Sequence, residues 1–113
     1  MSDCIFCKII EKQIPTDILY ETADIMAFAD IEPKAPVHIV IIPKNHIPSI
    51  NTLSEDNANL IGKMILAAKK LAETHDINET GYRLIMNCGP DAGQSVKHIH
   101  LHLLGGKKFT DEA

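Results

Sequence analysis

Residues 98–104 read HIHLHLL, three histidines that alternate strictly with aliphatic residues. Successive side chains of a β-strand point to opposite faces, so this pattern predicts a strand with His98, His100 and His102 on one face. The aliphatic residues then form the opposite, core-facing side. The strand rise sets consecutive histidines roughly 6.5–7 Å apart. That spacing does not favour one shared metal ion. It suits a row in which each imidazole contacts a different part of an extended ligand.

A glycine-rich polar segment, CGPDAGQS at residues 88–95, comes just before the predicted histidine strand. Backbone N–H groups in such a loop can bind an anion. Histidines titrate near neutrality, and a row of them beside an anion-binding loop indicates a functional site. A neutral nitrogen nucleophile next to bound phosphate suggests chemistry at phosphorus.

Length and composition predict one domain over residues 1–113, because the chain is too short for two sizeable cores and 45% of its residues are hydrophobic. The net charge of −4 and the scattered lysines argue against nucleic acid as a partner. The longest aliphatic run, residues 39–42, is too short to cross a membrane, and no signal peptide is evident. Three cysteines, with Cys4 and Cys7 at metal or redox spacing, favour the cytoplasm.

Hydrophobic spacing along the chain predicts an α+β fold with a mostly antiparallel five-stranded sheet, a short N-terminal helix and one long helix. The β-branched run over Val37–Ile42 is typical of a central strand buried on both faces. The predicted helices cover Ile5–Ile14 and Glu55–His75, and the predicted strands cover Asp17–Glu21, Ile25–Phe28, Val37–Ile42, Tyr82–Asn87 and His98–Leu104.

The long helix has features that define its start and its buried face. Ser54 is the expected N-cap residue, because its hydroxyl can accept a hydrogen bond from the first turn. Apolar residues form a wide arc on one side of the helix. Leu66 lies outside this arc, which hints at a second buried surface such as a dimer interface.

Several segments together resemble the histidine triad superfamily, which takes its name from a motif like HIHLHLL. In the same order as in that family, the chain carries FADIEPKAPVH at residues 28–38, IPKNH at 42–46, NCG at 87–89 and GQSV at 93–96. The resemblance covers residues 4–106, and GQS before the triad and LGG after it look most like the Hint branch. It implies a homodimer with a sheet shared across the dimer, and hydrolysis of purine nucleoside phosphoramidates to the nucleoside monophosphate.

By this resemblance His100 is the nucleophile, and attack on the α-phosphorus gives a nucleotidyl-histidine intermediate. His102 is expected to hydrogen-bond an α-phosphate oxygen, and Ser95 to assist the departing amine. His38 looks like a histidine of this branch that contacts the triad rather than the substrate. A histidine of the hydrophobic core is an almost equal interpretation. No divalent ion is required if these groups carry the charge.

The resemblance also implies a nucleotide site. Asp30 matches the residue that binds the ribose hydroxyls, and the alternative is an Asx turn before Pro33. One further set of positions matches the apolar residues around the purine in that family, although these residues could equally belong to the hydrophobic core. Another set matches residues on the phosphate side. The apolar set is Ile5, Phe6, Ile9, Phe28 and Ile31, and the phosphate set is Asn87, Gly93, Gln94, Ser95 and Val96.

Zinc is expected at Cys4 and Cys7 together with His46 and His98, which resemble the ligands of zinc-bearing members. Such a closed site would be structural, and reduced thiols without metal are the alternative. Three other functions stay open. They are hydrolysis of dinucleoside polyphosphates, nucleotide binding with incidental catalysis, and a metal-binding module.

Overall fold

A computed structural model describes residues 3–110 and has the predicted α+β architecture. Short 3₁₀ turns at Ile50–Thr52, Glu55–Asn57 and Pro90–Ala92 connect the main elements. The helices are α1 (Ile5–Ile10) and α2 (Ala58–Thr74), and the strands are β1 (Ile18–Glu21), β2 (Ile25–Ala29), β3 (Val37–Pro43), β4 (Tyr82–Ile85) and β5 (Leu101–Gly105).

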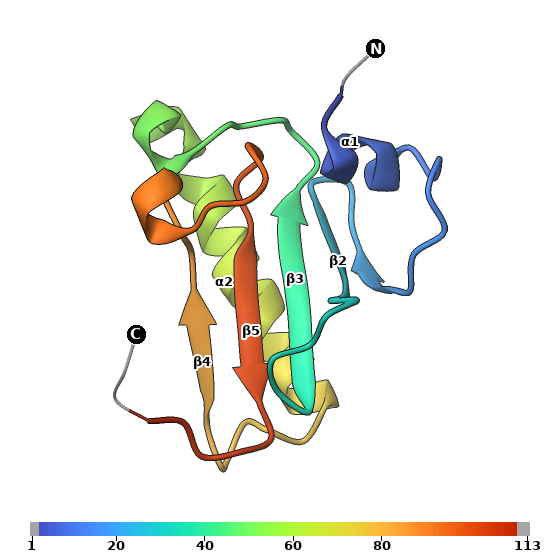
Figure 1. The fold of residues 1–113 in the computed structure, drawn as a ribbon, viewed down its shortest axis with the longest axis vertical. Coiled ribbons are helices and arrows are strands. Elements are labelled where there is room, and N and C mark those ends of the chain that lie inside the picture. The colour runs from blue at the N-terminus through green and yellow to red at the C-terminus, as the bar shows by residue number, and fades with distance from the viewer. Residues whose placement is uncertain (1–2, 111–113) are drawn as a thin grey trace.

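The five strands form one antiparallel sheet in the order β1-β2-β3-β5-β4. The long helix α2 covers one face, whereas α1 lies at the other side, near the end of β3 (Figure 1). β3 is the central strand, and all of it beyond Val37 is buried, as its β-branched composition predicts.

Strand alternation divides the interior into two clusters. On β3, Ile39 and Ile41 pack toward α2, in a core that includes Met64 and Leu71 of that helix. The alternate residues Val40 and Ile42 belong to a smaller cluster with α1. Because the side-chain period of a strand is two, each strand supplies the core from one face and the functional side from the other.

The N-terminal helix is shorter than predicted and ends at Ile10, because Lys12 adopts a left-handed conformation with φ 62°. The N–H of Lys12 donates to the Ile9 carbonyl, and that of Gln13 donates to the Lys8 carbonyl. These two bonds form a Schellman motif, which ends a helix.

The long helix also begins later than predicted. Residues 55–57 form a 3₁₀ turn, and the α-helix runs from Ala58 to Thr74. Ser54 is the N-cap residue of this 3₁₀ turn and not of the α-helix, whose N-cap position is held by Asn57. The Ser54 backbone N–H donates to the Asn57 side chain. Leu66 is exposed, as its position outside the apolar arc predicts.

The histidine strand starts three residues later than predicted. β5 begins at Leu101, opposite Ile41 of β3, and the Ile99 N–H donates instead to the Ile47 carbonyl. His98 and His100 therefore precede the strand, and only His102 lies in it. β4 stops at Ile85 rather than Asn87, because its last partner is His102, near the start of β5.

In the part of the chain that the structure describes, neither helix is long and apolar enough to cross a membrane.

Candidate active site

His100 is held by the backbone of its own segment. Its Nδ1–H donates to the His98 carbonyl at 2.8 Å. A neutral imidazole carries one proton, so this bond leaves Nε2 with a lone pair. No other hydrogen bond to the His100 ring is present among residues 3–110. No fully buried side-chain nitrogen in this range lacks a hydrogen-bond partner, so Nε2, which has none, is not fully buried. Nε2 therefore has a free lone pair, although the His100 residue as a whole is only 4% exposed and is not among the residues that line the two cavities described below.

A second group, which we call the aspartate–histidine cluster, consists of Asp30, His38 and His102. The Lys34 backbone N–H donates to His38 Nδ1 at 3.0 Å, which places the proton of His38 on Nε2. The His38 Nε2–H donates to His102 Nδ1 at 2.9 Å, and Asp30 Oδ2 lies 3.3 Å from His38 Nε2. His102 must then carry its own proton on Nε2, as a hydrogen-bond donor.

Burial keeps the two histidines of the aspartate–histidine cluster neutral near pH 7. Desolvation is the largest cause that lowers the pKa of His102, to about 4, and His100 and His38 lower it further. The pKa of His38 is also lowered, mainly by burial, although the Asp30 carboxylate opposes this shift. Neutral rings can each offer one donor and one acceptor, which the hydrogen-bond pattern above requires.

A cavity of about 570 Å³ opens over this cluster. Its lining includes Asp30, Ile31, His38, Asn87, Gly93, Ser95 and His102. The cavity is large enough for a small ligand. The structure thus brings Asp30, predicted to bind ribose, together with Asn87, Gly93, Ser95 and His102 of the predicted phosphate side. Gln94, Val96 and His100 are not among the residues that line this cavity.

The glycine-rich loop is braced by two predicted ligand residues. The Asn87 side chain donates to the Ala92 carbonyl at 2.9 Å. Gln94 accepts from the Gly89 N–H at 2.9 Å and donates to the carbonyls of Pro48 and Val96. The Gln94 amide therefore shapes the loop rather than facing the cavity, and Gly93 makes its turn with φ 81°.

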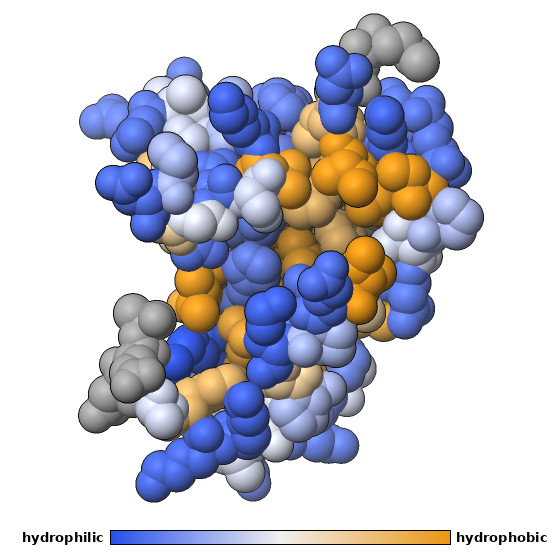
Figure 2. Space-filling view, viewed as in Figure 1, coloured by the Kyte–Doolittle hydropathy of each residue, from blue (hydrophilic) through white to orange (hydrophobic). Residues whose placement is uncertain are grey.

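The apolar residues predicted around the purine fall into two groups. Ile5 and Ile31 are 48% and 92% exposed, whereas Phe6, Ile9 and Phe28 are buried. Hydrophobic surface gathers beside α1 on the face opposite α2 (Figure 2). Only Ile5 and Ile31 offer a ligand much surface, so the sequence could not separate ligand contact from core at these positions.

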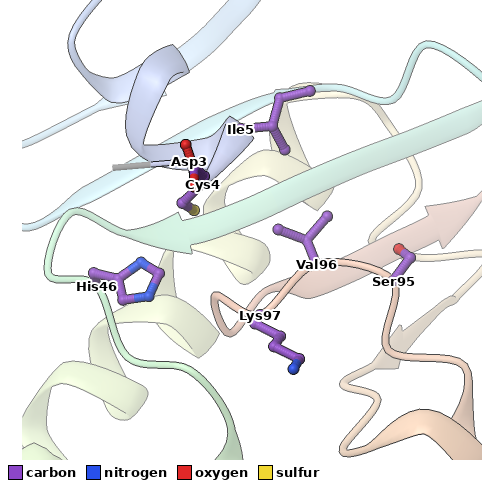
Figure 3. A pocket seen from close by; sticks show the side chains of 7 residues that line it. All are labelled: Asp3, Cys4, Ile5, His46, Ser95, Val96 and Lys97. Carbon is purple, nitrogen blue, oxygen red and sulfur yellow. The ribbon is translucent and has the colours of Figure 1, made fainter. Parts of the chain in front are cut away.

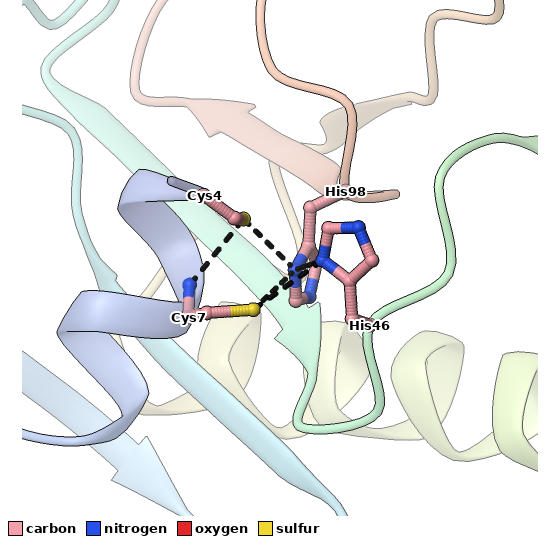
Figure 4. A group of neighbouring side chains, drawn as sticks. All are labelled: Cys4, Cys7, His46 and His98. Atoms are coloured by element: carbon pink, nitrogen blue, oxygen red, sulfur yellow. Dashed lines mark hydrogen bonds between the residues drawn. The ribbon is translucent and has the colours of Figure 1, made fainter. Parts of the chain in front are cut away.

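The cysteine–histidine cluster consists of Cys4, Cys7, His46 and His98, and it brings α1 against the loop after β3 and the segment before β5 (Figure 4). His98 Nδ1 lies 3.4 Å from Cys4 Sγ, 3.7 Å from Cys7 Sγ and 3.2 Å from His46 Nδ1. Cys7 Sγ is 3.3 Å from His46 Nδ1.

These residues fit a tetrahedral zinc ion. Zinc–sulfur and zinc–nitrogen bonds of about 2.3 and 2.0 Å place neighbouring ligand atoms about 3.3–3.8 Å apart. His98 Nε2–H donates to the Pro43 carbonyl at 2.8 Å, so its Nδ1 carries a lone pair that points into the cluster. Burial is the largest cause that lowers the pKa of His98, which favours this neutral, ligating form.

A second cavity of about 460 Å³ lies beside this cluster (Figure 3), and Ser95 lines both cavities. Its lining includes Ile5, His46, Val96 and Lys97. Lys97 was not among the predicted site residues, nor was the Lys34 backbone N–H. A single lysine gives no specific signal in a sequence, and a backbone N–H gives none at all.

Comparisons with known proteins agree with this fold. The family model described as "Scavenger mRNA decapping enzyme C-term binding" matches residues 3–111. The purine nucleoside phosphoramidase of Escherichia coli (strain K12) is 50% identical over 105 residues, which cover 93% of this chain and 88% of that protein.

Two solved structures extend the comparison. A HIT family hydrolase from Legionella pneumophila Philadelphia 1 has a TM-score of 0.95 at 47% identity, with 96% of this chain and 97% of that chain covered. A histidine triad nucleotide-binding protein from Candida albicans has a TM-score of 0.81 at 35% identity, with 98% of this chain and 85% of that chain covered.

Fold and site together define a class, small α+β proteins with a row of histidines on one face of an antiparallel sheet. The chain belongs to the histidine triad superfamily. The family predicted from the sequence motifs is thereby confirmed.

Proposed function

We propose that this protein hydrolyses purine nucleoside phosphoramidates, cleaving the α-phosphate bond to an amine or acyl leaving group. The observation that carries the proposal is the His100–His98 hydrogen bond, because it leaves a nitrogen lone pair on a ring that packs against His102, and His102 lines the cavity together with Gly93 and Ser95. The activity named for the Escherichia coli relative supports the same reaction.

The reaction has two displacements. The lone pair on His100 Nε2 forms a bond to the α-phosphorus while the bond from phosphorus to the leaving group breaks. The departing amine takes up a proton from solvent and is hydrogen-bonded by Ser95. Water then attacks the phosphorus of the nucleotidyl-histidine, its bond to His100 breaks, and the nucleoside monophosphate leaves. His98 supports the nucleophile through its carbonyl.

His102 stabilises negative charge on the phosphate. Its Nδ1 is occupied by His38, so its Nε2–H is the group that can donate to a non-bridging oxygen. Backbone N–H groups from residues 93–96 of the loop add donors fixed in place before substrate binds. These neutral donors carry the reaction without a divalent ion in the chemical step.

Asp30 is proposed to bind the ribose hydroxyls. Asp30 also forms the Asx turn that is the alternative role of this residue, because its Oδ1 accepts the Glu32 N–H at 2.8 Å. That bond uses one oxygen only. An ionised carboxylate has about four lone pairs, so both roles fit one side chain.

The proposed activity is tested by comparing hydrolysis of an adenosine phosphoramidate with that of a diadenosine polyphosphate. We expect faster turnover of the phosphoramidate, and a rapidly quenched reaction should trap nucleotide on His100. Faster turnover of the polyphosphate would favour the competing hydrolase activity. Tight AMP binding with no turnover of either substrate would favour a regulatory nucleotide-binding role.

We also propose a structural zinc ion in the cysteine–histidine cluster, in accord with the distances and tautomer described above. Thiols available for metal binding are compatible with the cytoplasm, which we propose as the compartment. Zinc per chain, measured by mass spectrometry after dialysis into metal-free buffer, should be close to one. A metal-free protein that remains folded would contradict the zinc proposal.

A homodimer with a shared sheet is the third element of the proposal. β4 lies at one end of the strand order, and among the described residues it pairs only with β5. Such an edge can pair with a second copy. Leu66 lines a groove with Tyr20 and Thr22 of the β1 side, so it does not support this edge. Sedimentation should give twice the chain mass, and a monomer at micromolar concentration would refute the dimer.

A further inference from the structure

The Cys4–Cys7 pair has the spacing of redox motifs as well as that of metal sites, and the zinc proposal accounts only for the latter. Cys4 is the N-cap residue of α1, and the Cys7 backbone N–H donates to Cys4 Sγ at 3.4 Å. The two sulfur atoms lie within 4.8 Å of each other. Helix geometry places Cα atoms three residues apart about 5 Å from each other, a distance that a disulfide bond can span.

A small oxidant in solvent can reach this pair. Both cysteines are partly exposed, and Cys4 lines the cavity of about 460 Å³ beside the cysteine–histidine cluster (Figure 3). All three cysteines are reduced in the structure. Cys88 is also partly exposed, but it does not belong to that cluster. Cys4 and Cys7 are therefore the cysteines that the cluster places together for joint oxidation.

The same sulfur atoms link α1 to the segment of the nucleophile. Cys4 Sγ and Cys7 Sγ lie 3.4 and 3.7 Å from His98 Nδ1. The carbonyl of that histidine accepts the hydrogen bond from His100. Metal ions are ligated by thiolates. A disulfide between the cysteines would therefore leave His46 and His98 as the remaining ligands, which are too few for a closed four-ligand zinc site.

We propose that Cys4 and Cys7 form a reversible oxidation site, at which hydrogen peroxide joins the two sulfur atoms and so breaks their link to His98. One sulfur attacks a peroxide oxygen and the O–O bond breaks, which gives a sulfenic acid. The second sulfur then attacks the sulfenic sulfur, so that the S–S bond forms and the S–O bond breaks. The sulfur atoms lose two electrons in total, the peroxide oxygens gain them, and the two thiol protons complete two molecules of water. Where zinc holds the thiolates, solvent supplies these protons and the metal ion is released.

The test follows the protein and the metal separately. Zinc-loaded protein is treated with hydrogen peroxide, alkylated and digested with trypsin, and the peptide that ends at Lys8 contains both cysteines. This peptide should lose two hydrogens, escape alkylation and revert after dithiothreitol, because thiol–disulfide exchange reduces the bond. Zinc should appear in solution in step with it, at about one ion per chain. Cys88→Ser is the matched control and should respond like the wild type, whereas Cys7→Ser should not form the cross-link.

The consequence for the active site is measured on the same samples. Since the link at His98 holds the segment that orients His100, oxidised protein should turn over the phosphoramidate at least about threefold more slowly, with recovery after dithiothreitol. A disulfide that involves Cys88, a sulfinic acid in place of the disulfide, or equal turnover before and after oxidation would overturn the proposal.

The inference rests on the proposed zinc site for the released metal and on the proposed phosphoramidase activity for the turnover, and these failures are distinguishable. If the purified protein contains no zinc, or turns over no substrate, those proposals fail, while the peptide mass still decides whether Cys4 and Cys7 are joined. If zinc and turnover are present but no disulfide forms, only the oxidation site is refuted.

Discussion

The cysteine–histidine cluster contains the histidine two residues before His100, and the aspartate–histidine cluster contains the one two residues after it. The two clusters look alike as sets of ligand atoms. In both, the potential ligand atoms lie within 4.8 Å of one another. In each cluster, one imidazole has a far nitrogen that points away from the cluster, namely His98 Nε2 in the first and His38 Nδ1 in the second. The two clusters differ in the backbone group that is hydrogen-bonded to that nitrogen. In the first, His98 donates to a carbonyl, whereas in the second His38 accepts from the Lys34 N–H.

This difference in one backbone partner decides what each cluster can do. A carbonyl at the far nitrogen places a lone pair inside the cluster, which suits a metal ion. An N–H at the far nitrogen places a proton inside the cluster, which suits a chain of hydrogen bonds to a ligand. Proximity of histidines and a carboxylate is therefore insufficient evidence for a metal site.

The largest expected effect concerns His100, which belongs to neither cluster. His100→Ala removes the bond-forming nitrogen, so kcat should fall by about 10⁴-fold or more. AMP affinity and zinc content should change little, because neither cluster loses a residue. Single-turnover kinetics, calorimetric titration with AMP and metal analysis of the same preparation test this. Undiminished turnover would show that the nucleophile lies elsewhere.

The next effect tests the metal side of the comparison. Cys7→Ser should lower the free energy of unfolding by about 3–4 kcal/mol in zinc-buffered solution, because zinc binding contributes directly to folding. Denaturant unfolding measures the loss. Cys88→Ser is the control, since Cys88 lies outside the cluster, and it should cost less than about 1 kcal/mol. Equal losses in the two variants would remove the basis for the zinc site.

A smaller effect tests the hydrogen bonds of the aspartate–histidine cluster. His38→Leu removes the donor to His102 Nδ1, so kcat should fall about 30-fold while zinc content is unchanged. His38→Gln can place an amide N–H near the position of Nε2, and should recover most of that loss. Steady-state kinetics of both variants give the comparison. No difference between Leu and Gln would contradict the assigned tautomers.

The smallest effect is on stability at acid pH. Histidine in the unfolded chain has its ordinary pKa near 6.5, whereas that of His102 in the folded protein is about 4, mainly because of burial. Both states are neutral above pH 6.5, and the full stability is present there. As pH falls from 6.5 toward 4, only the unfolded chain takes up this proton, so stability should fall by about 1.5 kcal/mol by pH 5.5. Unfolding of His102→Asn across this range should show a slope smaller by about one proton than the wild type.

The sequence predicted the sheet, the long helix and the family because these depend on local patterns. Alternation at residues 98–104 placed the histidines on one side, and the β-branched run identified β3 as the central strand. The end of α1 was wrong because a lysine took the left-handed position that glycine usually signals. The start of β5 was wrong because a loop carbonyl, that of Ile47, takes the Ile99 N–H.

The residues of both clusters were named from sequence, but their hydrogen-bond partners were not. Which nitrogen of His38 or His98 carries the proton depends on backbone groups of Lys34 and Pro43 that tertiary structure brings close. Likewise, Phe6 and Ile5 are adjacent apolar residues in one short helix, and only packing shows that one is buried and the other exposed.

The alternation of β3 and β5 has a consequence for how this protein can change over generations. Deleting one residue within Val37–Pro43 or Leu101–Gly105 would turn every later side chain of that strand to the opposite face. A deletion of Leu101, for example, would turn His102 into the apolar core under α2 and Leu103 toward the cavity lined by Asp30 and His38. These two segments can tolerate exchanges of one aliphatic residue for another, whereas a change in the length of either would displace functional side chains as surely as replacing them.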